Sequence, residues 1–65
     1  MNLREALSAY IGRDVEVATN SFYYEGRLLA VDDATITVQP PNGYVPPPPI
    51  EISIASINYV RVLVA

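Results

Sequence analysis

Few side chains in this sequence could do chemistry, and no group of them has the composition of a catalytic site. The adjacent acids Asp32 and Asp33 could bind a metal or act as acid and base, but neighbouring side chains diverge, no third ligand is identifiable, and turn chemistry explains the pair better. The serines have no histidine to activate them, because the chain contains none, and it contains no cysteine for thiolate metal sites or disulfides. We therefore expect no enzyme activity, no metal site and no cofactor.

The five tyrosines are the other chemically notable group. Tyrosine can stack on nucleic-acid bases without reading sequence, and it is equally suited to barrel rims and subunit interfaces, where the ring is buried and the hydroxyl is wet. The second reading is favoured because few basic residues lie between the tyrosines. Tyr44, inside a proline-rich stretch, is the best candidate for an exposed contact. The tyrosines are Tyr10, Tyr23, Tyr24, Tyr44 and Tyr59.

Charge argues against strong electrostatic binding to RNA or DNA. The net charge is −3, with 7 acidic residues against 4 arginines and no lysine. Nucleic-acid binders normally carry a basic patch that releases counterions from phosphates.

A chain of 65 residues allows a single domain, residues 1–65, with no room for a second core. Such a domain buries only about 60% of its unfolded surface and usually needs additional stabilisation from disulfides, a metal or oligomerisation. Because the chain has no cysteine for disulfides or thiolate metal sites, self-association is the source of stability that remains. The sequence has no apolar run of about 20 residues and no basic-then-apolar leader, so we expect a cytoplasmic protein without a membrane partner.

Residues 2–11 have the pattern of a short helix. Asn2 is a suitable N-cap, Glu5 follows three residues later as in a capping box, and Gly12 fits the stop. One apolar stripe at helical spacing must dock on the rest of the fold, because a helix of about ten residues is not stable alone. The stripe consists of Leu3, Ala6, Leu7, Tyr10 and Ile11.

From Arg13 onward the hydrophobic period becomes two, which predicts strands. The predicted strands cover residues 13–18, 22–31, 35–39, 50–54 and 59–64. The second is apolar on both faces and has Gly26 at its middle, which indicates a sharply bent strand of a closed barrel. The predicted fold is mainly β, a short N-terminal helix followed by a five-stranded, strongly bent antiparallel barrel. The apolar last strand favours a homo-oligomer, because it is a poor edge to leave bare.

The order and spacing of these segments resemble the Sm and Sm-like family, including its bacterial Hfq branch. "EGRLLAVDDATITV" looks like the family's first motif, with Gly26, Leu28 and Asp32 in the places of its glycine, apolar residue and aspartate. "IGRDVEV" resembles the entry to the first strand, and "ISIASINYV" is similar to the second motif. The resemblance covers nearly the whole chain. It implies a ring of five to eight subunits in which the fourth strand of one subunit pairs with the fifth of the next. The interface residues it implies are Ile50, Ile52, Ile54, Tyr59, Val60, Val62 and Val64.

The family's RNA pocket is only partly present. Residues 34–36 are Ala, Thr and Ile where the family has a stacking side chain, often with an asparagine nearby. Residues 54–56 are Ile, Ala and Ser where it has an arginine–glycine or lysine–histidine pair. The remaining RNA-binding candidates are Asp32, Thr35 and Tyr44. Two functions stay open: an RNA-binding ring with a non-standard or weakened pocket, and a ring that serves as a structural or protein-interaction scaffold.

The proline-rich stretch, residues 40–49, allows two readings. A stiff loop between two strands is favoured, because both flanks have strand patterns and polyproline II loses little entropy on ordering. The alternative is a docking segment for a proline-recognising protein with an aromatic-lined groove.

Overall fold

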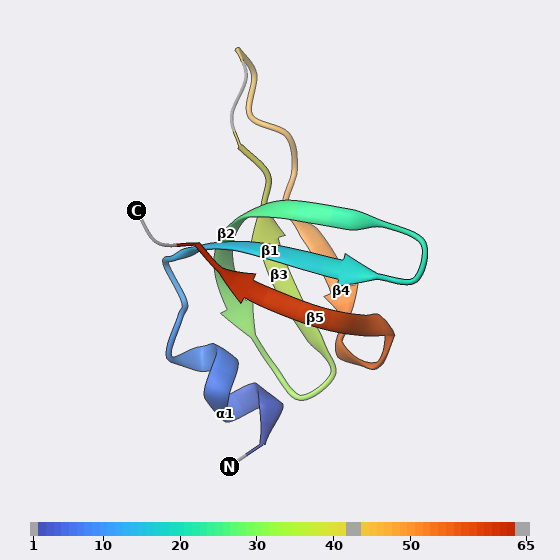
Figure 1. Ribbon diagram of the computed structural model, residues 1–65. Helices are drawn as coiled ribbons and strands as arrows, with labels where there is room; N and C mark the ends of the chain where they lie inside the picture. Colours follow the sequence, from blue (N-terminus) through green and yellow to red (C-terminus); the bar gives the residue numbers. More distant parts are fainter. Residues whose placement is uncertain (1, 42–43, 64–65) are drawn as a thin grey trace.

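The computed structural model describes residues 2–41 and 44–63 and consists of one short helix and one antiparallel sheet (Figure 1). The mainly β fold and the order of its elements are confirmed. The elements are α1 (Leu3–Ser8), β1 (Asp14–Thr19), β2 (Tyr23–Val31), β3 (Thr35–Gln39), β4 (Ile50–Ser53), the 3₁₀-helix η1 (Ile54–Ser56) and β5 (Ile57–Val62).

Helix α1 is capped as the sequence predicts but ends earlier. The Asn2 side chain accepts a hydrogen bond from the Glu5 amide at 2.8 Å. Beyond the helix, the Tyr10 amide donates to the Leu7 carbonyl, a three-residue spacing that tightens the chain into turns before Gly12. Leu7 is the one buried residue of the helix. Much of the predicted stripe therefore stays exposed in a single copy.

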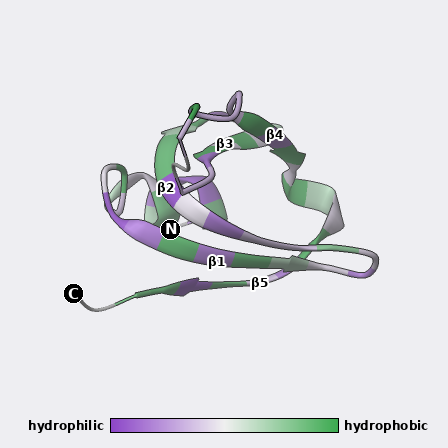
Figure 2. Cartoon of the chain, turned by 90° about the horizontal axis from the view of Figure 1, so that it is seen from above, coloured by the Kyte–Doolittle hydropathy of each residue, from purple (hydrophilic) through white to green (hydrophobic). Residues whose placement is uncertain are grey.

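The sheet has the strand order β4-β3-β2-β1-β5. Strand β2 serves both halves: residues 23–27 pair with β1 and residues 27–31 pair with β3, with a register shift between Leu28 and Ala30. Figure 2 accordingly shows β3 and β4 together and β1 and β5 together, with β2 between the two pairs. Within the described residues no ladder joins β4 to β5, so the sheet is open. The predicted strongly bent barrel is therefore corrected: in the part of the chain that the structure describes, the five strands form an antiparallel sheet that is neither closed nor strongly curled, with β4 and β5 as its edges.

The core lies on one face of the sheet, and the period-two pattern places it. Alternate residues of β1 and β3 are completely buried, as is Leu28 of β2, whose apolar neighbour Leu29 points to the other face and is 40% exposed. Burying each aliphatic side chain of this kind stabilises the fold by about 1.5–3 kcal/mol. The buried hydrophobic side chains are those of Leu7, Val15, Val17, Leu28, Ile36, Val38 and Ile52.

The residues implied as a subunit interface lie in different environments. Ile52 belongs to the chain's own core at 4% exposure, and Tyr59 is 48% exposed. Val64 lies outside the described residues. The others are half-buried and pack against the core, namely Ile50, Ile54, Val60 and Val62. The edges thus carry apolar side chains that one chain covers only in part.

Candidate functional site

The turn between β2 and β3 holds two of the predicted RNA-binding residues, Asp32 and Thr35. The Asp32 Oδ1 accepts hydrogen bonds from the amides of Ala34 and Thr35, both at 2.8 Å, and the Thr35 hydroxyl donates to Oδ2 at 3.2 Å. The bonds from the Ala34 and Thr35 amides are the main cause that lowers the pKa of Asp32 below its ordinary value. Both carboxylate oxygens therefore serve the turn, and Asp32 is committed to capping it.

This turn lies beside the start of η1. The Ile54 amide donates to the Ala34 carbonyl at 2.9 Å, and Thr35 is the register partner of Ser53. The two segments that resemble the family's pocket are thus neighbours in space. Their side chains are small or aliphatic, and the Ser56 hydroxyl is bonded to the Ser53 carbonyl. The junction offers a nucleotide backbone polar groups and small side chains, without an aromatic or cationic side chain of its own.

One cation lies close to this turn. Arg4 of α1 forms an ion pair with Asp33, with 3.3 Å between Nε and Oδ1. Both side chains are exposed, so the pair is worth at most about 1 kcal/mol. An incoming phosphate could compete with Asp33 for this guanidinium.

Tyr44 is not part of this junction. It lies in the proline-rich loop, which follows the other end of β3, and its side chain is fully exposed. In Figure 1 the loop and the β2–β3 turn extend from opposite ends of the sheet. The structure therefore brings Asp32 and Thr35 together and separates Tyr44 from them.

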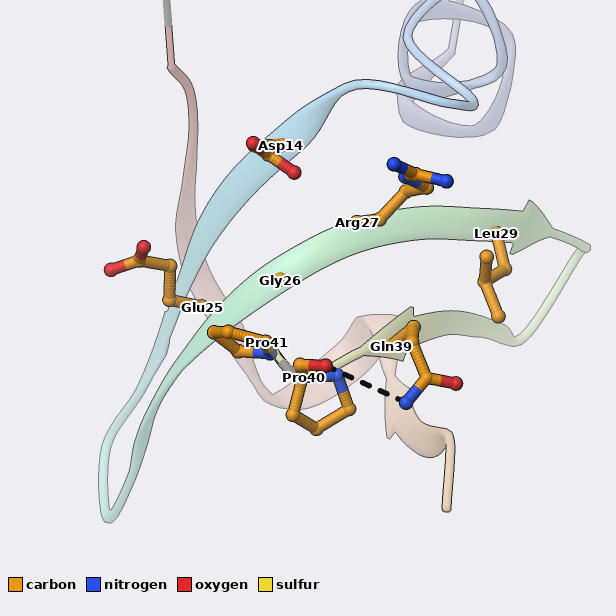
Figure 3. A pocket seen from close by; sticks show the side chains of 8 residues that line it. All are labelled: Asp14, Glu25, Gly26, Arg27, Leu29, Gln39, Pro40 and Pro41. Atoms are coloured by element: carbon orange, nitrogen blue, oxygen red, sulfur yellow. Dashed lines mark hydrogen bonds between the residues drawn. The ribbon is translucent and has the colours of Figure 1, made fainter. Parts of the chain in front are cut away.

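A pocket of about 270 Å³ lies at the base of the proline-rich loop (Figure 3). Its charged groups are two carboxylates, from Asp14 and Glu25, and the Arg27 guanidinium, with Asp14 and Arg27 register partners on neighbouring strands. It holds no nucleophile with an activating base. The remaining lining residues are Gly26, Leu29, Gln39, Pro40 and Pro41.

Gln39 joins the two arms of the loop. Its Nε2 donates to the Pro47 carbonyl at 2.7 Å and lies 3.5 Å from the Pro40 carbonyl. This hydrogen bond was not predicted from the sequence. A signal for it exists, because Gln39, whose side-chain amide can donate, directly precedes a segment rich in prolines, whose backbone can only accept hydrogen bonds. The hydrogen bond fixes where the proline run leaves the sheet.

A second pocket, of about 410 Å³, lies between the β1–β2 turn and β4. Phe22 and Tyr24 line it, with ring centroids 6.0 Å apart and ring planes tilted by 37°. Phe22, which directly precedes β2, is 64% exposed. The other lining residues are Thr19, Asn20, Ser21, Glu51, Ile52, Ser53 and Ser56. The pocket therefore borders the core at the edge strand β4, whose residue Ile52 belongs to both.

The outer face of β2, β1 and β5 carries a row of aromatic side chains. Tyr23 and Tyr59 are both register partners of Ala18, and they are 55% and 48% exposed. In the next outward-facing row Glu16 lies between Glu25 and Arg61, with 3.3 Å between its Oε1 and the Arg61 Nη1. A hydrogen bond with Glu16 is the main cause that raises the pKa of Tyr23 to about 12.

Neither a family model, nor a curated protein, nor a solved structure matches this chain. The helix followed by a five-stranded antiparallel sheet is consistent with the Sm-like topology. Among the residues that the structure describes, no helix is long and apolar enough to cross a membrane, and no three histidine, cysteine, aspartate or glutamate residues gather as a metal site.

Proposed function

We propose that the chain is a non-enzymatic, Sm-like subunit that assembles through its two free sheet edges into a homo-oligomeric ring of five to eight copies. The observation that carries the proposal is the open sheet, in which no described segment pairs with the outer side of β4 or of β5. Pairing β4 of one copy with β5 of the next would continue the sheet around the ring and complete the barrel-like enclosure that one chain lacks.

The unpaired donors of β5 can be assigned from its ladder with β1. The Leu63 amide donates to the Asp14 carbonyl, so these residues form a hydrogen-bonded pair. Hydrogen-bonded and non-bonded pairs alternate in an antiparallel ladder. Val62 and Val60 are the register partners of Val15 and Val17 in the intervening non-bonded pairs, so their amides point away from β1.

The same argument applies to β4. The Ile54 amide donates to the Ala34 carbonyl, so the amides of Ser53 and Glu51, in the non-bonded pairs, point away from β3. Each edge thus presents two outward amides. An edge-to-edge ladder would satisfy both sets and bury the half-buried aliphatic residues beside them, together with the Phe22–Tyr24 pocket.

For the ligand of the ring we propose RNA, bound weakly at the junction of the β2–β3 turn and η1. The proximity of Ala34 and Ile54 supports this location. A second candidate is a structural or protein-interaction scaffold without RNA. It is favoured by the two Asp32 oxygens that the turn already uses, and by the net charge of −3.

The assembly is tested by the native mass of the protein at micromolar concentration. The wild type should be a homo-oligomer. Glu51→Pro should dissociate it while the fold survives, because proline at this position removes an outward amide and leaves the ladder with β3 intact. Glu51→Ala is the matched control and should stay oligomeric. A folded monomeric wild type would overturn the proposal.

The ligand is tested by titrating short U-rich and A-rich RNA at low and moderate salt. Weak binding that declines with added salt supports the RNA-binding ring. Arg4→Ala should weaken that binding further, with Arg13→Ala as a control cation outside the junction. An intact oligomer that binds neither RNA at low salt would leave the scaffold as the function.

A further inference from the structure

The proline arm, residues 44–49, is held on the sheet with one edge turned outward. A proline run forms a polyproline II helix with three residues per turn, so Pro46 and Pro49 share one edge. Both are exposed, whereas Pro47 between them is half-buried, and its carbonyl accepts a hydrogen bond from the Gln39 side chain at 2.7 Å. This bond fixes the arm from the side opposite to the exposed edge.

The chemistry of the arm defines what can recognise it. Prolines provide apolar ring faces and carbonyl acceptors but no amide donors. Tyr44 and Val45, which lead into the prolines, are 105% and 77% exposed and extend the apolar surface. Polyproline II segments dock in grooves lined by aromatic side chains. A complementary surface therefore needs aromatic rings side by side and hydrogen-bond donors next to them.

The pocket of Figure 3 lies at the base of the arm and shares residues with the same loop. Pro40 and Pro41 form part of its wall, and Gln39 both lines the pocket and holds Pro47. The exposed edge residues of the arm lie about 3 Å and about 6 Å along the proline helix from Pro47. A molecule that binds this edge therefore reaches the pocket as well.

The charge of the pocket adds a second requirement. Asp14 and Glu25 face the guanidinium of Arg27, so the carboxylates are in excess by one. In the part of the chain that the structure describes, the two ion pairs join other residues, so neither of these carboxylates is paired. Carboxylates beside an apolar wall are suited to the lysine or arginine side chains of a ligand.

Within its described residues the chain does not supply the aromatic groove itself. The Tyr23 hydroxyl, beside Tyr59 on the outer face, is hydrogen-bonded to Glu16. The rings of Phe22 and Tyr24 have centroids 6.0 Å apart, which is the spacing of rings in contact and leaves no room for a proline between them. In Figure 1 the loop projects away from the sheet, where another protein has access to it.

We infer that the proline arm and the pocket at its base form one docking surface for a polyproline-reading domain of another protein, whose aromatic groove is flanked by lysine or arginine. The groove takes the Pro46–Pro49 edge, and the basic flank enters the pocket between Asp14 and Glu25. The surface uses the outer side of neither edge strand. It therefore serves a single copy and the proposed ring alike, and it does not rest on the proposed function.

The test is a calorimetric titration of the purified full chain with isolated WW, SH3 and EVH1 domains that carry lysine or arginine beside their grooves. At least one domain should bind saturably. The double variant Pro46→Ala plus Pro49→Ala should weaken that binding about tenfold or more, because it removes both rings of the exposed edge. The variant should fold, because both positions lie outside the strands.

A second variant, Asp14→Asn plus Glu25→Gln, tests the pocket. It should bind about threefold or more weakly and with a flatter salt dependence, because charges at the rim of an interface act mainly on association. Asp33→Asn is the matched control, an exposed acid in the β2–β3 turn at the opposite end of the sheet, and should bind as the wild type does. A synthetic peptide of residues 44–50 lacks the pocket and should bind no more tightly than the acid variant.

The inference would be overturned if none of the three domains bound the folded chain, or if the folded proline variant bound as tightly as the wild type. Equal affinities of the wild type, the acid variant and the peptide would also contradict it, because the pocket would then have no part in the contact. The native mass of each variant reports edge assembly separately. Loss of the oligomer with domain binding retained would count against the proposed function alone.

Discussion

The Cβ position of Gly26 points at the backbone of Gln39. A Cβ built there would lie 2.7 Å from the Gln39 carbonyl carbon, closer still to its oxygen, and 2.9 Å from the Val38 Cγ1. Gly26 is buried where β2 passes from its ladder with β1 to its ladder with β3. The glycine is therefore required by the close approach of two strands, and its φ angle is not in the left-handed region.

Gly26→Val should consequently destabilise the fold by about 3 kcal/mol, because the side chain can be accommodated only if β3 moves away. Thermal melts and denaturant titration measure the loss. Gly12→Ala is the matched control. Gly12 has a φ of 95° and open space around its Cβ position, so alanine there should cost about 1–2 kcal/mol of backbone strain. An unchanged melting temperature for Gly26→Val would mean that the strands do not approach in this way.

Leu28 should be the most sensitive large residue of β2. It is completely buried, and its backbone bonds both the Gly12 amide and the Arg13 carbonyl, which ties the helix connection to the sheet. Leu28→Ala should lower the free energy of unfolding by about 3 kcal/mol through lost burial and the cavity left behind. Its neighbour Leu29 is 40% exposed, so Leu29→Ala should cost under about 1 kcal/mol. Similar losses at both positions would contradict the assignment of faces.

Asp32 should make stability depend on acid pH. Its folded pKa lies below the ordinary value of 3.8, so its contribution is present in full above that value and is lost as pH falls through the lowered folded pKa. Asp32→Asn keeps an oxygen acceptor for the turn amides but cannot titrate. The variant should therefore lose less stability between pH 5 and pH 2 than the wild type, measured by denaturant midpoints. Parallel curves would show that Asp32 is not hydrogen-bonded in solution.

Tyr23 should make stability depend on alkaline pH with the opposite sign. Its folded pKa is raised from 10.0 to about 12, so its contribution is complete below pH 10.0 and is lost as pH rises towards 12. Ultraviolet titration of tyrosinate should resolve one late step, and Tyr23→Phe should remove that step. Glu16→Gln should shift it to lower pH, because the acceptor loses its charge. Persistence of the late step in Tyr23→Phe would assign it to another tyrosine.

The strands could be predicted from the sequence because alternation along the chain records burial directly. Val15 and Val17 of β1, and Ile36 and Val38 of β3, are the inward residues in both the pattern and the structure. The helix predicted for residues 2–11 is longer than α1, because Tyr10 and Ile11 match the helical period but lie in the turns that follow the helix. Period alone does not distinguish a last helical turn from the turns that follow it.

Contacts between strands distant in sequence could not be predicted in the same way. The aromatic row of Tyr23 and Tyr59 requires the registers of two ladders, and the Gln39–Pro47 bond requires the path of a loop. Closure of the sheet is a further example, because it depends on what the free edges of β4 and β5 meet. The proximity of Ala34 and Ile54 could be expected from the sequence, because the family resemblance assigns both segments to one pocket.

Replacing Pro46–Pro49 by a Gly/Ser segment of equal length should leave the fold and the edge-paired oligomer intact. Residues 46–49 lie outside the strands, so their replacement breaks no strand pairing. Each proline contributes roughly 0.4–1 kcal/mol by restricting the unfolded chain, so stability should fall modestly.

The Gln39 side chain donates to the backbone carbonyl of residue 47, which any residue at that position retains. Gln39→Leu is therefore the variant that removes this hydrogen bond while keeping the prolines. Native mass and melting temperature should be measured on both variants. Dissociation of the Gly/Ser variant, with Gln39→Leu still oligomeric, would place the prolines themselves in the subunit contact and contradict assembly through the edges alone.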